Sequence, residues 1–374
     1  MQQKIFSNEV SYKALESQRP SNLVTSKKGT IMLIKLTHAH ILGTVIAYLI
    51  GVCLVPMVIS FSKKEGLVDM PNARKIHTHP ISRIGGVAIW TSTMLTFLCL
   101  VFMSYYPSGN LLSGILLGGS LMFLLGLVDD IYNLDAKFKL FLQVSIATLV
   151  YLLGVQINNV PFIGDIGLFS YPITMLWIVG ISNALNFIDG VDGLAGSVVT
   201  VNAVTLAIIA VAMTPPNPIS ALIGFILAGS MLAFLTYNFN PAKIFMGDSG
   251  ALFSGFLLAT ISITGVMKAA TLAILLPFLV LAVPIMDITF SSLRRIAKGK
   301  SPFVADAEHI HHKLLHAGFS QKKTVMILTS VAIIAGALAS LFMGAETIIH
   351  YFICIVVLVV IMLLLNVIKA LTKR

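Results

Sequence analysis

Apolar residues are grouped along this chain into long runs that contain no charged side chain. Most runs are close to the roughly 20 apolar residues that a helix needs to cross a bilayer. The runs cover residues 36–62, 84–128, 140–164, 166–188, 193–242, 249–267, 269–286, 324–345 and 347–368. This pattern predicts an all-α, polytopic integral membrane protein.

Two of the runs are too long for one helix, and both contain residues that are typical of turns. Run 84–128 includes "YYPSGN" at 105–110, and run 193–242 includes "TPPNP" at 214–218. Clusters of proline, glycine and asparagine end helices. Dividing both runs at these points predicts about eleven transmembrane helices. An odd number places the two termini on opposite sides of the membrane.

The polar segments between the runs differ in charge. Lys and Arg are concentrated in alternate segments and in the C-terminal tail, whereas the opposite loops contain only Lys268. Because short basic loops stay in the cytoplasm, the N-terminus is predicted outside and the C-terminus inside. The same rule explains the formal net charge of +10 without a nucleic-acid partner. Only 11% of residues are charged, against about 25% in soluble domains, which also indicates a membrane protein.

The N-terminal segment has a different composition. Residues 1–35 are mostly polar and lack a sustained apolar period, so they predict a disordered tail, with a single transmembrane domain over 36–374. The basic residues of this tail oppose its predicted external position. Translation from Met32 would leave only Lys35 before the first span and remove the conflict. Translocation of a long tail despite its charge is the alternative.

Acidic residues lie at the predicted cytoplasmic ends of the spans. They are Asp129, Asp130, Asp189, Asp192, Asp248 and Asp287. Because a charge in lipid is costly, acids at several span ends predict a shared site at the membrane surface. One helical turn would bring Asp189 and Asp192 onto the same face as Asn183 and Asn186. Clustered carboxylates at a water boundary suit Mg²⁺.

Basic and amide side chains fill two of the predicted cytoplasmic loops, 63–83 and 287–323. The candidates for substrate binding there are Asn72, Arg74, Lys75, Arg294, Arg295, His309, His311 and His312. Guanidinium and imidazolium groups are good donors to phosphate oxygens. Three histidines could instead bind Zn²⁺, but Cys53, Cys99 and Cys354 lie in separate apolar runs and add no ligand pattern.

Acids that bind Mg²⁺ and bases that bind phosphate, at one membrane face, predict phosphoryl transfer. The chain has no G-x-x-x-x-G-K-[ST] motif, which excludes a P-loop ATPase. A cation-coupled secondary transporter is the main alternative, because acids within membrane proteins are also typical of that class. Transporter sites lie near the middle of the membrane, however, whereas these acids lie at span ends.

Six motifs in this order resemble one enzyme family. They are "VDMPNARKIHTHPISRIGG", "GLVDDIYNLDAKFK", "NALNFIDGVDGLAG", "NPAKIFMGDSGAL", "PIMD" followed by "RR", and "HIHH". They are similar to motifs of the polyprenyl-phosphate N-acetylhexosamine-1-phosphate transferases, over about residues 38–370. That family includes undecaprenyl-phosphate GlcNAc-1-phosphate transferases and the phospho-MurNAc-pentapeptide translocases. "HIHH" after "RR" resembles the GlcNAc-1-phosphate branch.

The resemblance implies roles for individual residues in five cytoplasmic loops, 63–83, 129–139, 186–193, 238–250 and 287–323. It implies catalytic roles for Asp129, Asp130, Asp189 and Asp192. It makes Asp248 the principal Mg²⁺ carboxylate, with Asp129 and Asp130 as further metal ligands. Asn186, Asp189 and Asp192 match the nucleotide-side motif, and His309, His311 and His312 match the histidine motif. Asn183 and Asn186 of the third motif and Asn238 and Phe245 of the fourth motif count as further substrate-binding candidates.

The resemblance also implies a reaction and a location. GlcNAc-1-phosphate would pass from UDP-GlcNAc to undecaprenyl phosphate with Mg²⁺, for which Mn²⁺ could substitute, and UMP would be released. The product would start a lipid-linked glycan of the cell surface, such as lipopolysaccharide or a cell-wall polysaccharide. Another UDP-N-acetylhexosamine or UDP-MurNAc-pentapeptide is the alternative donor. The enzyme would be a multi-pass protein of the cytoplasmic (inner) membrane with its active site facing the cytoplasm, and assembly as a homodimer is left open.

Overall fold

The computed structural model describes residues 22–70, 79–104, 110–160, 163–213, 216–267, 275–297, 309–344, 346–356 and 359. The long helices are α2 (Asn22–Lys64), α3 (Gly85–Phe102), α4 (Asn110–Tyr132), α5 (Ala136–Leu152), α6 (Ser170–Ile188), α7 (Leu194–Ala212), α8 (Pro218–Asn238), α9 (Gly247–Ile261), α11 (Ala282–Ala297) and α13 (Gln321–Phe342). The shorter ones are the 3-10 helix η1 (Gly167–Phe169), the π-helical η2 (Ser262–Met267), α10 (Leu275–Val280) and α12 (Ile310–His316). The predicted all-α class is confirmed.

Two short antiparallel strand pairs accompany the helices. They join β1 (Val68–Asp69) to β2 (Ile81–Ser82) and β3 (Asn159–Val160) to β4 (Gly164–Asp165). The sequence analysis did not predict them, because strands of two residues are too short to show an alternating pattern.

Seven helices among the described residues are long and apolar enough to cross a membrane. They are His38–Lys64, Gly85–Phe102, Leu111–Tyr132, Gly167–Ile188, Leu194–Ala212, Pro218–Asn238 and Gln321–Phe342. The other predicted spans fall on α5, on α9 with η2, on α10 and α11, and on the apolar helix Glu346–Val356. The protein is therefore polytopic, and the count of eleven stays a prediction.

Both predicted breaks separate two helices. Helix α3 ends at Phe102 and α4 begins at Asn110, while α7 ends at Ala212 and α8 begins at Pro218. At the second break, the side chain of Asn217 caps α8 by accepting a hydrogen bond from the Ser220 amide. Proline at the first helical position has no amide hydrogen that needs a partner there.

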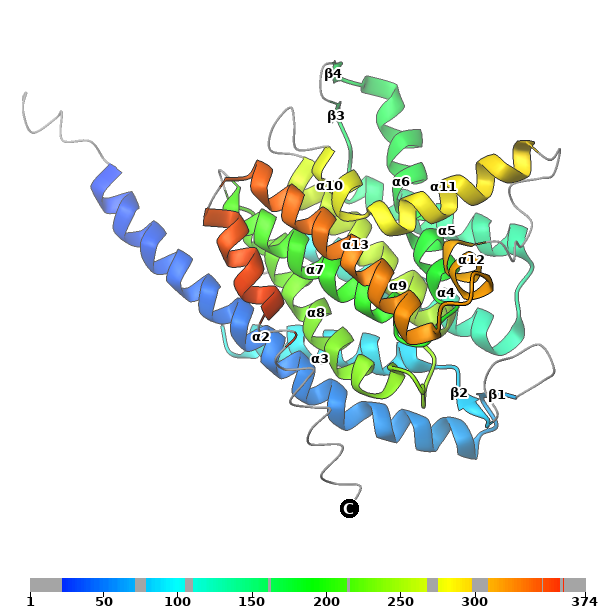
Figure 1. The fold of residues 1–374 in the computed structure, drawn as a ribbon. Helices are drawn as coiled ribbons and strands as arrows, with labels where there is room; N and C mark the ends of the chain where they lie inside the picture. Colours follow the sequence, from blue (N-terminus) through cyan, green and yellow to red (C-terminus); the bar gives the residue numbers. More distant parts are fainter. Residues whose placement is uncertain are drawn as a thin grey trace, which may run out of the picture.

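Helix α2 begins earlier than the sequence predicted. Residues 22–35 continue the first span as helix, ahead of its predicted start at residue 36, and residues 1–21 lie outside the described residues; a disordered tail stays a prediction. Between Pro20 and Pro56 no proline interrupts the chain, and the polar residues there are compatible with a helix that extends from a packed segment. In Figure 1 this part of α2 projects beyond the other helices.

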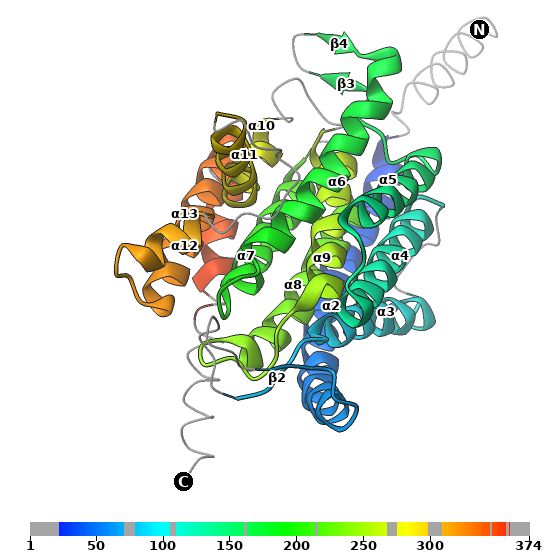
Figure 2. The ribbon, with the colours of Figure 1, turned by 90° about the vertical axis from the view of Figure 1, so that its right-hand side faces the viewer.

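The helices form a bundle around α7, α8 and α9. In Figure 2, α6 to α9 run side by side, with α2 to α5 on one flank and α10 to α13 on the other. Every residue of α9 from 249 to 261 is buried. Small residues permit the closest approach: a Cβ at Gly229 of α8 would lie 2.3 Å from the Thr44 carbonyl oxygen of α2. Such contacts are typical of helices that pack in membranes.

Several connections meet at one end of the bundle. The turn from α4 to α5, the turn from α6 to α7, the loop from α8 to α9 and the β1–β2 hairpin are joined there by hydrogen bonds and a shared cavity. These connections carry most of the acidic residues that the sequence singled out.

Candidate active site

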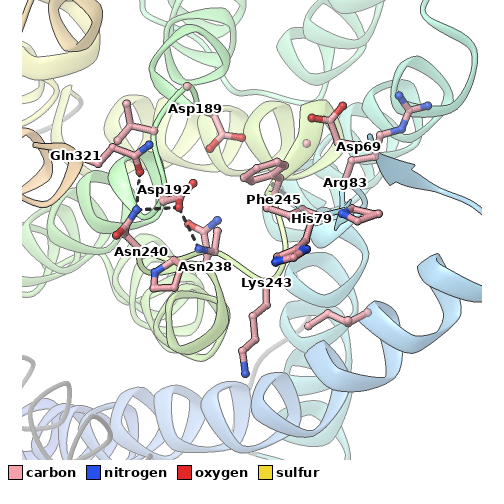
Figure 3. Close-up of a pocket in the computed structure, with 18 of the residues that line it drawn as sticks. Asp69, His79, Arg83, Asp189, Asp192, Asn238, Asn240, Lys243, Phe245 and Gln321 are labelled. Atoms are coloured by element: carbon pink, nitrogen blue, oxygen red, sulfur yellow. Dashed lines mark hydrogen bonds between the residues drawn. The ribbon is translucent and has the colours of Figure 1, made fainter. Parts of the chain in front are cut away.

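A cavity of about 950 Å³ lies where these connections meet (Figure 3). Its walls come from the end of α2, the β1–β2 hairpin, the α6–α7 turn, the α8–α9 loop, α12 and the start of α13. The predicted site residues that line it are Asn186, Asp189, Asp192, Asn238, Phe245, Asp248 and His312. Segments far apart in the sequence are thus brought to one space.

Lys139 of α5 joins two of the predicted acids. Its ammonium donates to Asp129 Oδ2 at 2.7 Å and also pairs with Asp248 Oδ2. The second oxygen of Asp129 accepts from the Leu134 amide at 2.7 Å, and Asn186 Nδ2 donates to Asp248 Oδ2 at 3.1 Å. We define Asp129, Lys139 and Asp248 as the charged cluster.

The sequence analysis missed the role of Lys139, although a signal was present. Lys139 lies in the first turn of α5, where the helix dipole disfavours a cation. A lysine whose side chain is only 14% exposed at that position needs nearby acids to offset the cost, and here it has two.

Asp130 serves a different purpose from its neighbour Asp129. Its Oδ1 accepts from the Asp248 amide at 2.8 Å, and its Oδ2 accepts from the Ser249 amide at 3.0 Å and the Ser249 hydroxyl at 2.6 Å. Asp130 therefore caps the start of α9 from another helix. Gly247 makes this approach possible: its φ is +71°, and a Cβ there would lie 2.7 Å from Asp130 Oδ2.

The residues present fit Mg²⁺ with a smaller ligand set than predicted. Asp129 and Asp248 turn one oxygen each toward the same cation, the Lys139 ammonium. Mg²⁺ commonly binds one or two carboxylates and completes its shell with water and phosphate. Both oxygens of Asp130 are already held by α9, so the arrangement does not support the prediction that Asp130 is a metal ligand.

Asp189 and Asp192 lie on the α6–α7 turn in different surroundings. Burial raises the pKa of the Asp189 carboxyl well above its ordinary value, and the Asp248 and Asp130 carboxylates raise it further. A carboxyl of this kind can hold or accept a proton nearer to neutral pH. Asp192 Oδ2 instead accepts from Asn240 Nδ2 at 3.1 Å and from the Ala242 amide at 3.0 Å.

Asn240 extends this contact to the start of α13. Its Nδ2 also donates to Gln321 Oε1 at 2.6 Å, and all three side chains line the cavity (Figure 3). We define Asp192, Asn240 and Gln321 as the amide cluster. The sequence analysis identified Asp192 but neither amide.

Two of the predicted asparagines, Asn238 and Asn183, have different positions: one lines the cavity and the other lies in a contact between two helices. Asn238 lines the cavity and also fastens its wall, because it accepts from the Gly193 amide at 2.9 Å and donates to the Ile244 carbonyl at 2.7 Å. Asn183 is not among the residues that line the cavity. Its amide pairs with that of Gln143 on α5. The structure thus does not bring Asn183 to the predicted substrate site.

The three histidines of "HIHH" have three different environments. His309 Nδ1 lies 2.8 Å from Asp287 Oδ2, and its ring stacks on Phe187 with centroids 5.3 Å apart. His311 is 1% exposed, and burial together with His312 lowers its pKa to about 4. Of the three, only His312 is among the residues that line the cavity. The described residues contain no group of three or more His, Cys, Asp or Glu that could hold a metal, so the zinc alternative has no support there.

Apart from His312, the basic residues that line the cavity differ from those predicted. Arg294 and Arg295 lie in the last turn of α11 and are not among its lining residues. Asn72, Arg74 and Lys75 lie outside the described residues. The other basic residues that line the cavity come from the end of α2, the β1–β2 hairpin and the α8–α9 loop: Lys63, His79, Arg83 and Lys243.

Comparisons with known proteins agree with this chemistry. The family model described as Glycosyl transferase family 4 matches residues 112–266. The chain is 33% identical to the Bacillus subtilis (strain 168) "Probable undecaprenyl-phosphate N-acetylglucosaminyl 1-phosphate transferase", over 85% of this chain and 89% of that protein. It is 34% identical to the "Decaprenyl-phosphate N-acetylglucosaminephosphotransferase" of Mycobacterium leprae, over 74% and 77% of the two chains.

A third relative is the "Undecaprenyl-phosphate alpha-N-acetylglucosaminyl 1-phosphate transferase" of Escherichia coli K12, 29% identical over 75% of this chain and 77% of that protein. These similarities cover most of the chain, and the family model spans the α6–α7 turn and the α8–α9 loop. They also exclude the transporter alternative. The chain is a multi-pass membrane enzyme that belongs to the polyprenyl-phosphate N-acetylglucosamine-1-phosphate transferase family.

Proposed function

We propose that this enzyme transfers GlcNAc-1-phosphate from UDP-GlcNAc to undecaprenyl phosphate, giving undecaprenyl-diphospho-GlcNAc and UMP. The observation that carries the proposal is that Asp248 of the charged cluster and all three residues of the amide cluster line one cavity, in a family whose relatives bear this activity in their names. The relatives name two acceptors, undecaprenyl and decaprenyl phosphate, and we choose the first because it is named for the Bacillus and Escherichia proteins.

The reaction requires one bond to form and one to break. A phosphate oxygen of the lipid attacks the β-phosphorus of the UDP-sugar, and the bond from that phosphorus to the bridging oxygen breaks. UMP leaves with the electron pair. Catalysis of such transfers is mainly the positioning of reactants and the neutralisation of phosphate charge.

The charged cluster would hold the metal ion. Asp129 and Asp248 are the residues that would bind Mg²⁺, or Mn²⁺ in its place, and the ion would neutralise phosphate oxygens. Asn186 orients Asp248 by its hydrogen bond, and Lys139 supplies a cation beside both carboxylates. Lys63, Arg83 and Lys243 can bind further phosphate oxygens, because they line the same cavity.

The second group of acids suits proton handling and recognition. Asp189 lines the cavity with a raised pKa, so it can take a proton from the lipid phosphate before attack. The amide cluster presents hydrogen-bonding groups for uncharged parts of the donor. Because the loops around the cavity carry most of the Lys and Arg, we place the site on the cytoplasmic face of the inner membrane.

The test is transfer of label from UDP-[³H]GlcNAc to undecaprenyl phosphate by the purified protein in detergent. Butanol-extractable label and an equal amount of UMP are expected, and both should require Mg²⁺ or Mn²⁺. Label that enters lipid only from UDP-MurNAc-pentapeptide, or from another UDP-N-acetylhexosamine, would reassign the donor. Equal rates with decaprenyl phosphate would remove the choice of acceptor.

A further inference from the structure

Gln143 of α5 and Asn183 of α6 form a reciprocal pair of side-chain amides. Asn183 Nδ2 donates to Gln143 Oε1 at 2.7 Å, and Gln143 Nε2 donates to Asn183 Oδ1 at 3.2 Å. Gln143 is 1% exposed. Two amides that satisfy each other can lie in an apolar helix contact where a single one would be costly.

The hydrogen-bonding capacity of Asn183 is nearly used up by these contacts. The second hydrogen of its Nδ2 is directed to the Val179 carbonyl at 2.8 Å. An asparagine amide has two hydrogens to donate, so both are taken and one oxygen lone pair remains. Asn183 is therefore poorly suited to bind substrate, although its position in the motif suggested that role.

On each helix the pair lies one helical turn from a residue that donates to Asp248. Lys139 precedes Gln143 by four residues on α5, and Asn186 follows Asn183 by three residues on α6. Residues three or four apart share a helix face. Lys139 and Asn186 both donate to the same atom, Asp248 Oδ2.

The remaining hydrogen bonds between these two helices lie toward their other ends. Among the described residues, Thr148 bonds to Tyr171 at 2.9 Å and to the Met175 sulfur at 3.6 Å, and Tyr151 bonds to Ser170 at 3.3 Å. At the end near the cavity, the amide pair is thus the polar contact that sets the register of α5 against α6.

We propose that Gln143 and Asn183 are positioning residues, which hold α5 and α6 in register so that Lys139 and Asn186 converge on Asp248. This inference rests on the proposed function, in which Asp248 is at the reacting centre. It predicts that the pair controls turnover rather than substrate affinity, since displacing a catalytic group by about 1 Å can cost about 100-fold in rate.

The experiment compares variants of the full-length protein in the transfer assay. Asn183→Leu should lower kcat about 30-fold and change the KM for UDP-GlcNAc less than about 3-fold. The exchanged pair, Gln143→Asn with Asn183→Gln, should restore kcat to within about 5-fold of the wild type, because the two amides can pair again. Tyr171→Phe is the matched control, and it should stay within about 2-fold of the wild type.

A further double variant separates positioning from general stability. Gln143→Leu with Asn183→Leu replaces both partners by apolar groups, which can be nearly neutral for folding. Its thermal midpoint should approach that of the wild type. Its kcat should stay low, because two leucines form no directional contact that fixes the register of α5 against α6.

Three results would overturn the inference. They are Asn183→Leu with the turnover of the wild type, an exchanged pair that folds but is as slow as the single variants, and a rise in KM with kcat unchanged. Wild-type protein that transfers no GlcNAc-1-phosphate would defeat the proposed function, and this inference with it. Active wild type beside a fully active Asn183→Leu would defeat this inference alone.

Discussion

The charged cluster and the amide cluster each bring an aspartate to the same cavity, Asp248 and Asp192, but the two carboxylates have different partners. Asp248 shares a cation with Asp129, whereas Asp192 accepts hydrogen bonds from neutral amides. A carboxylate that faces a cation can also bind a metal ion, while one held by amides orients its neighbours. The groups that contact each aspartate, rather than its residue type, therefore decide its role.

The largest effect is expected from breaking the charged cluster. Asp248→Asn should lower turnover at least about 1,000-fold, because it removes the charge that both Lys139 and Mg²⁺ need. The thermal midpoint should change little, since this side chain is partly exposed. Turnover at saturating Mg²⁺ measures the effect, and Asp165→Asn, on the exposed β4 strand, is the control. Near-native turnover of Asp248→Asn at limiting Mg²⁺ would exclude Asp248 as the ligand.

Replacing Asp129 and replacing Asp130 should have different effects, the first on turnover and the second on stability. Asp130→Ala leaves three donors at the start of α9 without their acceptor, so it should lower the free energy of unfolding by about 2–4 kcal/mol. Asp129→Asn should keep the thermal midpoint of the wild type and lose turnover about 100-fold or more. Thermal unfolding and turnover of both variants decide the matter. The reverse pattern would show that the assigned roles are exchanged.

The amide cluster should respond with a smaller change, mainly in donor binding. Gln321→Leu removes the acceptor of Asn240 and should raise the KM for UDP-GlcNAc about 10-fold, a loss of about 1.4 kcal/mol, with kcat within about 3-fold. Initial rates at varied donor concentration measure this. Asn159→Ala, on the exposed part of β3, is the control. If the KM for the lipid acceptor rises instead, the amide cluster faces the acceptor.

The last effect is expected from pH and concerns stability rather than kinetics, through His311. Its pKa of about 4 in the folded protein is lower than the ordinary value of 6.5. Between these two values the unfolded chain binds the additional proton, so stability falls as the pH drops from 6.5 toward 4. His311→Gln should remove part of this loss, on the order of 2 kcal/mol at pH 4. Thermal midpoints from pH 7 to pH 4 measure it, with His350→Gln, an exposed histidine, as control. Parallel curves for His311→Gln and wild type would contradict the assignment.

The sequence predicted which residues of a local motif belong to the site more reliably than it predicted their contacts with other helices. The motifs around Asp189, Asp192 and Asp248 are local, and all three residues line the cavity. The roles of Asp130 and Asn183 depend on partners from other helices. Asp130 meets Ser249 across 119 positions, and Asn183 meets Gln143 across 40. No local pattern contains that information.

The sequence by itself determined that the chain is a bundle of membrane helices with acids at the helix ends. The length of an apolar run and the proline or glycine that ends it are local properties, which bilayer thickness and backbone geometry convert directly into helices. The tertiary structure alone decided which acids share a cation, which one caps a helix and which amides lock two helices together. Those outcomes depend on the distances between helices, which are set by packing over the whole bundle.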